Sequence, residues 1–353
     1  MIVKIGDVIS EYSVRNKFDE NIPVYSVTND KGFCTGYFSK EVASKDKSTY
    51  KIVPRGYFAY NPSRINVGSV DWQKYEDRVI VSPLYVVFGV SDRLDRQYLL
   101  HYLKSDMMLS FIKEYATGSV RDNLKLADLG KFPINLHPVE EQRQIATTLD
   151  KIDDLIAKRR QQLDKLDELV KSRFIEMFGD PVTNSKGLVT KKGLDFFTLT
   201  NGKFVPEGKR RDKGIPAYGG NGISWYTDEI LVTHDTIVVG RVGFQSGNVH
   251  FATGPLWVTD NAMYISDFNK DQYDLRFLCA LMEHIDFTRF QDAGDLKKIT
   301  QKPFTQMSFI APSIQQQKSF ITFVEQTDKS KYRQEKCIEF FRLLEKNIRQ
   351  EWL

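Results

Sequence analysis

The stretch of this sequence that most resembles a ligand-binding loop is residues 238–249, VVGRVGFQSGNV. Glycines and Arg241 follow a β-branched run there, which is the composition of a loop that binds phosphate. A second stretch, residues 59–70 (AYNPSRINVGSV), has the same outline: an apolar lead-in, then Arg64, then Gly68 before Ser-Val. One such loop could arise by chance, whereas two far apart in one chain indicate a duplicated unit.

Neither loop has the surroundings of a nucleotide-binding site. The sequence contains no GxxxxGK[ST] motif and no GxGxxG after a strand-like run. The segment after Gly247, NVHFATG, is strand-like, so no helix start would direct backbone amides at an anion. The adenine-methyltransferase tetrapeptide is also missing, because Asn61-Pro62-Ser63-Arg64 fails it at two positions. We therefore expect no cofactor to be bound by this chain.

Metal and hydrolytic chemistry have little support either. Glu207-Gly208-Lys209 resembles the Glu-x-Lys of nucleases, but it lies in a charged, glycine-rich turn with no acidic partner before it. No two histidines have metal-ligand spacing; they are His101, His137, His234, His250 and His284. The three cysteines, Cys34, Cys279 and Cys337, form no CxxC motif. This cysteine usage favours a reducing cytosol and argues against a disulfide framework or a zinc site.

The bulk properties favour a globular cytoplasmic protein of two domains. A length of 353 residues predicts about two domains of ordinary size. The net charge of only +4 means that any basic surface must be local. The start, MIVKIGDVIS, lacks the apolar core of a signal peptide, and no apolar run is long enough to cross a membrane.

Residues 140–178 predict one long helix with a coiled-coil seam. They contain no Gly and no Pro, Pro138 precedes them, and Gly179 with Pro181 should end the helix. Apolar residues recur at alternating steps of four and three, namely Ile145, Leu149, Ile152, Ile156, Leu163, Leu166, Val170 and Met177. The charges are balanced, nine acidic and eight basic, so this surface suits docking better than binding of DNA phosphates.

Residues 314–352 predict a second long helix that can supply a partner seam. Ser313 and Gln316 have the spacing of a capping box at its start. Its apolar positions are Phe320, Val324, Ile338, Phe341, Ile348 and Trp352, and they are interrupted by Thr327, Lys331, Gln334 and Glu345. We expect the interrupted part to pack loosely or to pair polar groups.

Landmarks in the same order before each helix predict two divergent copies of one unit. Pro138 and Gln142 match Pro312 and Gln316 at the same offset. The other matched pairs are IPVY (22–25) with IPAY (215–218), SPLYVVF (82–88) with TDNAMYI (259–265), LDRQYLLHYL (94–103) with YDLRFLCALM (273–282), and YATGSVRDNL (115–124) with QDAGDLKKIT (291–300). The intervening runs are short, β-rich and broken by Gly, Pro and Asn, so each domain should be α+β with a mostly β body and a helix near its end.

Four segments carry a family resemblance that covers essentially the whole chain. They are HPVEEQRQIATTLDKID (137–153), MFGDPVTNSKG (177–187), IPAYGGNGISWY (215–226) and TIVVGRVGFQSGNV (236–249). Together they resemble the specificity subunit of a type I restriction-modification system. The resemblance implies an α+β, pseudo-twofold fold in which two target-recognition domains, 1–137 and 181–311, are separated by two long antiparallel coiled-coil helices, 138–180 and 312–353.

The resemblance also implies a function. Each domain would read one half of a split DNA site, and the helices would set the spacer and dock two modification subunits. The chain itself would be non-catalytic and bind no cofactor. S-adenosylmethionine, ATP and Mg²⁺ would be bound by the modification subunits, which methylate adenine, and by the restriction subunits, which cut DNA with ATP. Because the two domains differ in sequence, the site should be asymmetric.

Two other functions remain open at this stage. A type IIB-like enzyme, in which one polypeptide methylates and cuts, could use the same specificity subunit. A structural coiled-coil adaptor without nucleic acid is the other alternative, although the two loop-rich domains would then lack a purpose.

The candidate DNA contacts come from the loops, because Arg and Asn can bridge base edges and Lys or Ser can bind phosphates. In the first domain they are Asn61, Ser63, Arg64, Asn66, Ser119, Arg121 and Lys125, and in the second Lys209, Arg210, Arg211, Asn221, Arg241, Gln245, Ser246, Lys297 and Lys298. Arg64 and Arg241 could instead form surface ion pairs or clamp a turn, and residues 209–211 could be a solvated loop. Packing is favoured over base stacking for Tyr60, Tyr218 and Trp225.

Overall fold

The computed structural model describes residues 1–36, 46–117 and 123–352. These residues form two compact units, here called unit 1 (residues 1–160 and 336–353) and unit 2 (residues 161–335). The two long helices, α4 (Val139–Phe178) and α7 (Ile314–Trp352), each contribute one half to each unit. The four-part division into two recognition domains and two helices remains a prediction. Along the described ranges, no helix combines the length and the hydropathy needed to cross a bilayer.

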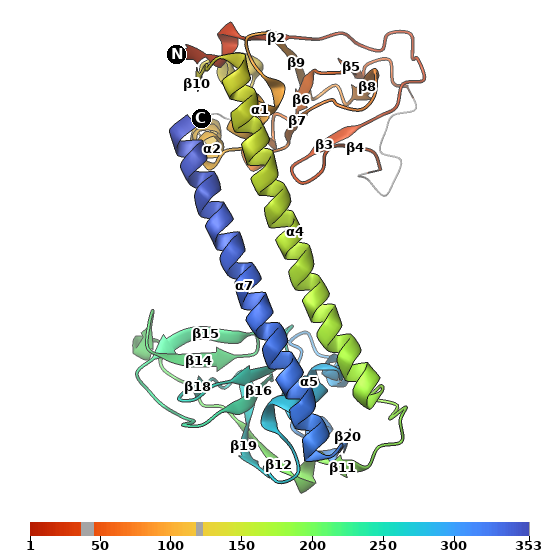
Figure 1. The fold of residues 1–353 in the computed structure, drawn as a ribbon, viewed down its shortest axis with the longest axis vertical. Coiled ribbons are helices and arrows are strands. Elements are labelled where there is room, and N and C mark those ends of the chain that lie inside the picture. The colour runs from red at the N-terminus through yellow and green to blue at the C-terminus, as the bar shows by residue number, and fades with distance from the viewer. Residues whose placement is uncertain (37–45, 118–122, 353) are drawn as a thin grey trace. The chain divides into compact units, whose positions relative to one another are not determined.

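Unit 1 is built around a four-stranded antiparallel sheet in the order β2-β9-β6-β7 (Figure 1). Smaller two-stranded pairs are β1-β10, β3-β4 and β5-β8. Its strands are β1 (Ile2–Lys4), β2 (Ile9–Glu11), β3 (Ser26–Thr28), β4 (Gly32–Cys34), β5 (Lys51–Pro54), β6 (Phe58–Tyr60), β7 (Val70–Trp72), β8 (Arg78–Val81), β9 (Val86–Val90) and β10 (Pro133–Asn135). Its shorter helices are η1 (Ile5–Asp7), η2 (Ile65–Val67), α1 (Arg96–Leu103), α2 (Asp106–Thr117) and α3 (Leu126–Leu129).

Unit 2 contains an equivalent antiparallel sheet in the order β12-β19-β16-β17. It adds a second sheet, β13-β15-β14-β18, and the pair β11-β20. Its strands are β11 (Thr190–Lys192), β12 (Phe197–Asn201), β13 (Arg210–Arg211), β14 (Ile215–Gly219), β15 (Gly222–Thr227), β16 (Thr236–Gly240), β17 (Val249–Ala252), β18 (Trp257–Val258), β19 (Ala262–Phe268) and β20 (Ser308–Ile310). Its shorter helices are η3 (Gly193–Asp195), η4 (Glu207–Lys209), α5 (Leu275–Glu283), η5 (Phe287–Phe290) and α6 (Lys302–Gln306).

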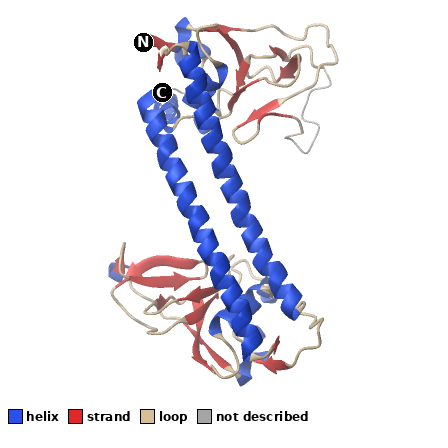
Figure 2. Ribbon diagram, viewed as in Figure 1, coloured by secondary structure: helices blue, strands red, loops and turns tan. Residues whose placement is uncertain are grey.

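The two units repeat one topology, as the sequence landmarks predict. Both four-stranded sheets have the same strand order, and α1 and α5 follow the corresponding strands, β9 and β19. Asp95 and Asp274 cap these two helices in the same way, each accepting hydrogen bonds from the second and third amides that follow. Figure 2 shows the mixture of helix and short strands in each unit, and the predicted α+β class is confirmed.

Each unit buries its own halves of the two long helices in its core. In unit 1, Ile145 and Leu149 of α4 share a hydrophobic cluster with Ile348 and Trp352 of α7. In unit 2 the cluster joins residues near the other end of each helix, such as Phe174 of α4 and Phe320 of α7, whose rings lie 5.4 Å apart. The helices are therefore antiparallel within each unit, and burial of the predicted seam is what holds them there.

The predicted helix boundaries are confirmed at both ends. Helix α4 starts directly after Pro138, and Gly179 ends it with φ of 75°, a left-handed conformation that favours glycine. At the start of α7, the Ser313 amide donates to Gln316 Oε1 at 3.1 Å, and the Gln316 amide donates back to Ser313 Oγ at 3.4 Å. This is the reciprocal capping box that the sequence predicts.

The repeat register after the prolines needs a correction of one residue. The side-chain amide of Gln142 donates to the carbonyl of His137, and Gln317 makes the same bond to the carbonyl of Pro312. Gln317 is thus the counterpart of Gln142, and the predicted match with Gln316 is wrong. The sequence misled because Gln316 and Gln317 are adjacent and Gln316 serves the capping box instead.

The interrupted seam of α7 pairs polar groups, as one of the two expectations states. In unit 2, Lys331 Nζ lies 2.6 Å from Asp167 of α4 and 3.5 Å from Asp328. In unit 1, Glu345 forms an ion pair of 2.8 Å with Arg349, and both side chains are mostly buried. Lys331 and Glu345 therefore place paired charges along the helix pair, whereas Gln334 Oε1 is buried without a hydrogen bond to the described residues.

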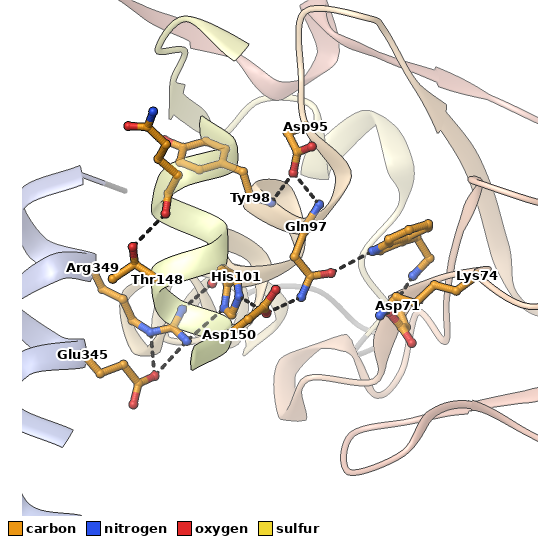
Figure 3. Close-up of polar contacts among 12 residues, drawn as sticks. Asp71, Lys74, Asp95, Gln97, Tyr98, His101, Thr148, Asp150, Glu345 and Arg349 are labelled. Carbon is orange, nitrogen blue, oxygen red and sulfur yellow. Dashed lines mark hydrogen bonds and ion pairs between the residues drawn. The ribbon is translucent and has the colours of Figure 1, made fainter. Parts of the chain in front are cut away.

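Arg349 belongs to a polar network that ties α7 to α1 and α4 in unit 1 (Figure 3). Its Nη1 donates to the carbonyl oxygen of His101 at 2.6 Å, and His101 Nε2 lies 2.8 Å from Asp150 Oδ1. Gln97 donates to the same carboxylate oxygen at 2.7 Å. Burial raises the pKa of Asp150, but the hydrogen bonds from His101 and Gln97 outweigh it, so the net pKa is lowered.

Candidate nucleic-acid interface

The two arginine-glycine loops occupy the same position in the two units. Residues 61–69 connect β6 to β7, and residues 241–248 connect β16 to β17. The registers agree, since Tyr60 pairs with Val70 at the base of one loop and Val239 pairs with Val249 at the base of the other. The predicted correspondence of the two loops is therefore confirmed, and both lie at the same edge of equivalent sheets.

The glycines of the second loop allow its own backbone to fold back on itself. A Cβ on Gly240 would lie 2.3 Å from the carbonyl oxygen of Gln245, and Gly247 has φ of 96° with Phe287 packed against it. The amide of Gly247 donates to the carbonyl of Gly240 at 2.8 Å, which closes the loop. Strand β17 follows at once, as the sequence predicts, so the loop does not open a helix that could bind a phosphate.

A second loop joins the hairpin loop in each unit. The amide of Leu124 donates to Pro62 O at 3.2 Å, and the amide of Ile299 donates to Arg241 O at 3.0 Å. In unit 1 the contact is extended by Ser63 Oγ, which lies 2.5 Å from the side-chain oxygen of Asn123. The ends of the matched segments 115–124 and 291–300 thus take equivalent positions, with Leu124 as the counterpart of Ile299, and both units present a pair of loops.

The described candidate residues of unit 1 cluster on this loop pair. Asn61 Oδ1 accepts the Ser63 amide at 3.1 Å and shapes the turn. Arg64 is exposed, and within the described ranges its side chain makes no hydrogen bond or ion pair. Asn66 is half-buried, and Lys125, directly after Leu124, is exposed. Ser119 and Arg121 lie outside the described residues.

In unit 2 the loop pair lines an open hollow of about 580 Å³. Three of the candidates, Arg210, Asn221 and Gln245, contribute to its wall. Arg210 and Asn221 are exposed, and Gln245 Oε1 accepts a hydrogen bond from Asn248. The remaining lining residues, all from β13–β15, the loops or adjacent turns, are Phe204, Val205, Gly219, Gly220, Ser224, Trp225, Val242, Gly243, Phe244, Thr259, Asp260, Asn261 and Leu296.

Arg241 clamps a turn, which is one of the alternatives left open for it. It is half-buried, and its Nη1 donates to the carbonyl of Asp260 at 3.0 Å. Arg64 differs, since its side chain is exposed. The carbonyl of Arg241 accepts the hydrogen bond from the second loop, as the carbonyl of Pro62 does in unit 1. Arg241 is therefore the counterpart of Pro62 and not of Arg64. The two arginines therefore occupy different positions on equivalent loops.

The basic cluster at residues 209–211 is exposed and largely paired. Lys209 lies 2.6 Å from Glu229, and Arg211 lies 3.1 Å from Asp228. Such exposed pairs contribute little to stability, so these cations can exchange carboxylates for phosphates at small cost. The guanidinium of Arg210 instead lies over the Trp225 ring, 5.2 Å from its centroid.

The other candidates of unit 2 differ in accessibility. The Lys298 side chain is exposed, whereas Lys297 is half-buried and its carbonyl accepts the Gly243 amide at 2.8 Å. Ser246 is fully buried, and its Oγ makes no hydrogen bond with the described residues. Because burial leaves this hydroxyl no surface for a ligand, Ser246 is omitted from the proposed interface.

The aromatic residues mostly pack, as expected. Tyr60 is buried and donates its hydroxyl to Leu124 O at 3.0 Å, and burial raises the pKa of that hydroxyl. Tyr218 packs against a small core in unit 2. Trp225 is half-buried but also lines the hollow. The sequence analysis missed Asn123 and Phe244, although both lie inside segments that it matched between the units.

Comparison with known proteins shows which proteins this chain is similar to. A family model described as the type I restriction modification DNA specificity domain matches residues 2–168. The protein named as the MjaX type I restriction enzyme specificity subunit of Methanocaldococcus jannaschii is 21% identical over 320 residues, covering 80% of this chain and 73% of its own length. The MjaIX specificity subunit of the same organism is 32% identical over 125 residues, 35% of this chain and 25% of that protein.

Solved structures have the same fold along the chain. The S subunit of a type I restriction-modification system from M. genitalium superimposes with a TM-score of 0.65 at 15% identity, covering 100% of this chain and 96% of that one. A chain from a structure of type I system assembly and conformational transition gives a TM-score of 0.62 at 15% identity, covering 99% of this chain and 96% of that one. Motifs, fold and relatives agree: residues 2–168 match the type I restriction modification DNA specificity domain, and the chain as a whole is similar to type I restriction-modification specificity subunits.

Proposed function

We propose that each unit reads one half of a bipartite, asymmetric DNA site through its pair of loops. The observation that carries this proposal is the repetition of the loop pair at the same edge of two equivalent sheets. The loops have the same backbone connections but different side chains, Arg64 with Asn66 in unit 1 and Gln245 in unit 2, where Asn221 of the β14–β15 turn lines the same hollow. Side chains of these types discriminate bases by paired hydrogen bonds, so different sets would read different half-sites.

The long helices suit the tasks of spacing and docking. Helix α4 has 40 residues and α7 has 39, so each is about 60 Å long at 1.5 Å per residue. A continuous helix resists bending, and half-sites read by two modules on it would be held at a fixed separation. Exposed apolar side chains on α7, including Phe340 and Leu343, offer surface for modification subunits.

The proposed chain is a non-catalytic cytoplasmic subunit. Two modification subunits would transfer the methyl group of S-adenosylmethionine to adenine, and restriction subunits would add ATP-dependent cleavage with Mg²⁺. Neither reaction is assigned to side chains of this chain.

A methylation map tests the proposal. The chain would be co-expressed with its modification subunit, and methylated bases would be mapped genome-wide. We expect one asymmetric sequence with a constant spacer. Arg64→Ala should relax recognition in one half only, and Gln245→Ala in the other only. Arg93→Ala, which changes an exposed arginine beyond the opposite end of β9, is the matched control. A map in which either loop variant altered both halves equally would contradict the proposal that each unit reads one half-site.

The same experiment addresses the type IIB-like alternative. In that case the methyltransferase and nuclease functions would co-purify on one partner polypeptide. A separate ATP-dependent translocase among the partners would instead assign the complex to type I.

A further inference from the structure

Phe244 is the most exposed large hydrophobic residue of the hollow in unit 2, and it forms no aromatic pair with the described residues. Its side chain is 88% exposed, although phenylalanine favours burial more than most residues. It lies at the tip of the loop between β16 and β17 and lines the same hollow as Arg210, Asn221 and Gln245. An aromatic ring exposed beside side chains proposed to read bases is in position to contact DNA itself.

The loop that carries Phe244 is held firmly. The amide of Gly243 donates to Lys297 O at 2.8 Å, and the amide of Ser246 donates to Gly243 O at 3.0 Å. The side chain of Gln291 donates to Ser246 O at 2.7 Å. With hydrogen bonds on both sides of residue 244, the backbone presents the ring in a preorganised position, which limits the entropy lost when it contacts a ligand.

Two further exposed apolar side chains line the same hollow. Phe204 is 67% exposed and Leu296 is 56% exposed, and both line the hollow with Phe244. Proteins that distort DNA use such apolar side chains as wedges between base pairs, next to polar groups that bind base edges and phosphates. Here the polar groups are Arg210, Asn221 and Gln245.

We propose that Phe244 is a wedge that inserts between two base pairs of the half-site read by unit 2. This proposal rests on the proposed function and adds a specificity determinant to it. Insertion would be favoured at base steps that unstack at low cost, so Phe244 would select sequence through deformability. The corresponding loop of unit 1, residues 61–69, contains no aromatic residue, and its exposed apolar side chain is Val67, which is 52% exposed. Unstacking should therefore be confined to one half-site.

The test uses the complex with its modification subunit and duplexes of the sequence given by the methylation map. Fluorescent adenine or cytosine analogues would replace single bases along both half-sites. With the wild-type complex, we expect the fluorescence to rise several-fold at one step of the unit 2 half-site and nowhere in the other. Phe244→Ala should abolish this signal and weaken binding about tenfold, the effect of losing one aromatic stacking contact.

Two variants keep the result interpretable. Phe244→Leu retains an apolar wedge and should keep part of the signal. Leu194→Ala removes an exposed apolar side chain of η3, at the opposite edge of the unit, and should behave like wild type. Equal affinity and equal signal for Phe244→Ala and wild type would overturn the wedge.

Other failures can be told apart. If the wild-type complex bound and methylated no DNA, the proposed function itself would fail together with the inference. If Phe244→Ala lost its modification subunit on gel filtration, the ring would be a protein contact and the wedge would be wrong.

Discussion

Gln142 and Gln317 make the same three hydrogen bonds in the two units, and both are fully buried. Each side-chain amide nitrogen donates to two backbone carbonyls. Each side-chain oxygen accepts a hydrogen bond from the backbone amide of the aspartate that caps α1 or α5. Gln142 bonds to Arg93 O at 2.9 Å, to His137 O at 2.7 Å and to the Asp95 amide at 2.8 Å. Gln317 bonds in the same way to Gln272 O at 3.1 Å, to Pro312 O at 2.8 Å and to the Asp274 amide at 2.8 Å.

Replacing either glutamine should destabilise its own unit. Gln142→Leu or Gln317→Leu leaves two carbonyls and one backbone amide, each buried or partly buried, without these partners, and we expect a loss of about 2–4 kcal/mol. Hydrogen exchange should locate the effect, with faster exchange of the Asp95 amide in the first variant and of the Asp274 amide in the second. Gln144→Leu, on the exposed side of α4, is the control. Unchanged exchange at both capping aspartates would show that the glutamines do not hold α1 and α5 against the long helices.

Arg349→Ala should release the C-terminal end of α7 from unit 1. The change removes the bond to His101 O and leaves Glu345, which is mostly buried, without its cation. Burial, and then the charge of Glu345, raise the pKa of Asp153, whereas the charge of Arg349 lowers it. Loss of Arg349 therefore also increases the repulsion between Asp153 and Glu345. We expect a cost of about 1–3 kcal/mol and faster hydrogen exchange in the last turns of α7. Arg342→Ala, which removes an exposed arginine of the same helix, should have no such effect.

Unit 2 should lose stability as the pH falls below about 6.5. His284 stacks on Phe174, with ring centroids 4.0 Å apart, and burial together with the nearby Lys171 lowers its pKa from 6.5. The unfolded chain binds a proton near pH 6.5 whereas the folded chain resists it, so unfolding is favoured below that pH. Burial lowers the pKa of His250 in the same direction.

The variant His284→Phe keeps the stack and removes one of these two titrating groups. Urea denaturation at pH 7.5 and 5.5 should show a smaller difference for this variant than for wild type. His234→Phe, which replaces an exposed histidine of the same unit, should match wild type. An undiminished pH effect in His284→Phe would assign the titration elsewhere.

Ser246→Ala should stabilise unit 2 and leave DNA recognition unchanged. The Ser246 hydroxyl is buried without a hydrogen bond to the described residues, so its removal relieves a desolvation cost of about 1 kcal/mol. Thermal denaturation would measure the gain and a methylation map would test recognition. Altered specificity in this variant would return Ser246 to the set of base-reading residues.

Lys125 and Lys298 should bind phosphates and not bases. Both side chains are exposed on the second loop of their units. Each substitution to alanine should weaken binding to all sequences alike and reduce the slope of log K against log salt by about 1. Lys270→Ala, an exposed lysine after the far end of β19, should leave the slope intact. A base-specific loss in either loop variant would contradict a phosphate contact.

The sequence by itself determined the long helices, their caps and the duplicated order of landmarks, because these depend on local chemistry. Pro138 and Gly179 bound α4 through backbone geometry, and Asp95 and Asp274 cap helices within three residues of themselves. The two loops were matched for the same reason, since each follows an apolar strand of fixed register.

Only the tertiary structure decided which side chains are available to a ligand. The loop sequences treat Arg64 and Arg241 alike, yet one is exposed and the other donates to the carbonyl of Asp260, a residue distant in sequence. Ser246 is two residues after exposed Phe244 in the sequence but is buried. Accessibility depends on which segments pack over a residue. Gln317, and not Gln316, bonds to the backbone beside α5 because its side of α7 faces the core. Neither is fixed by residue type or by spacing along the chain.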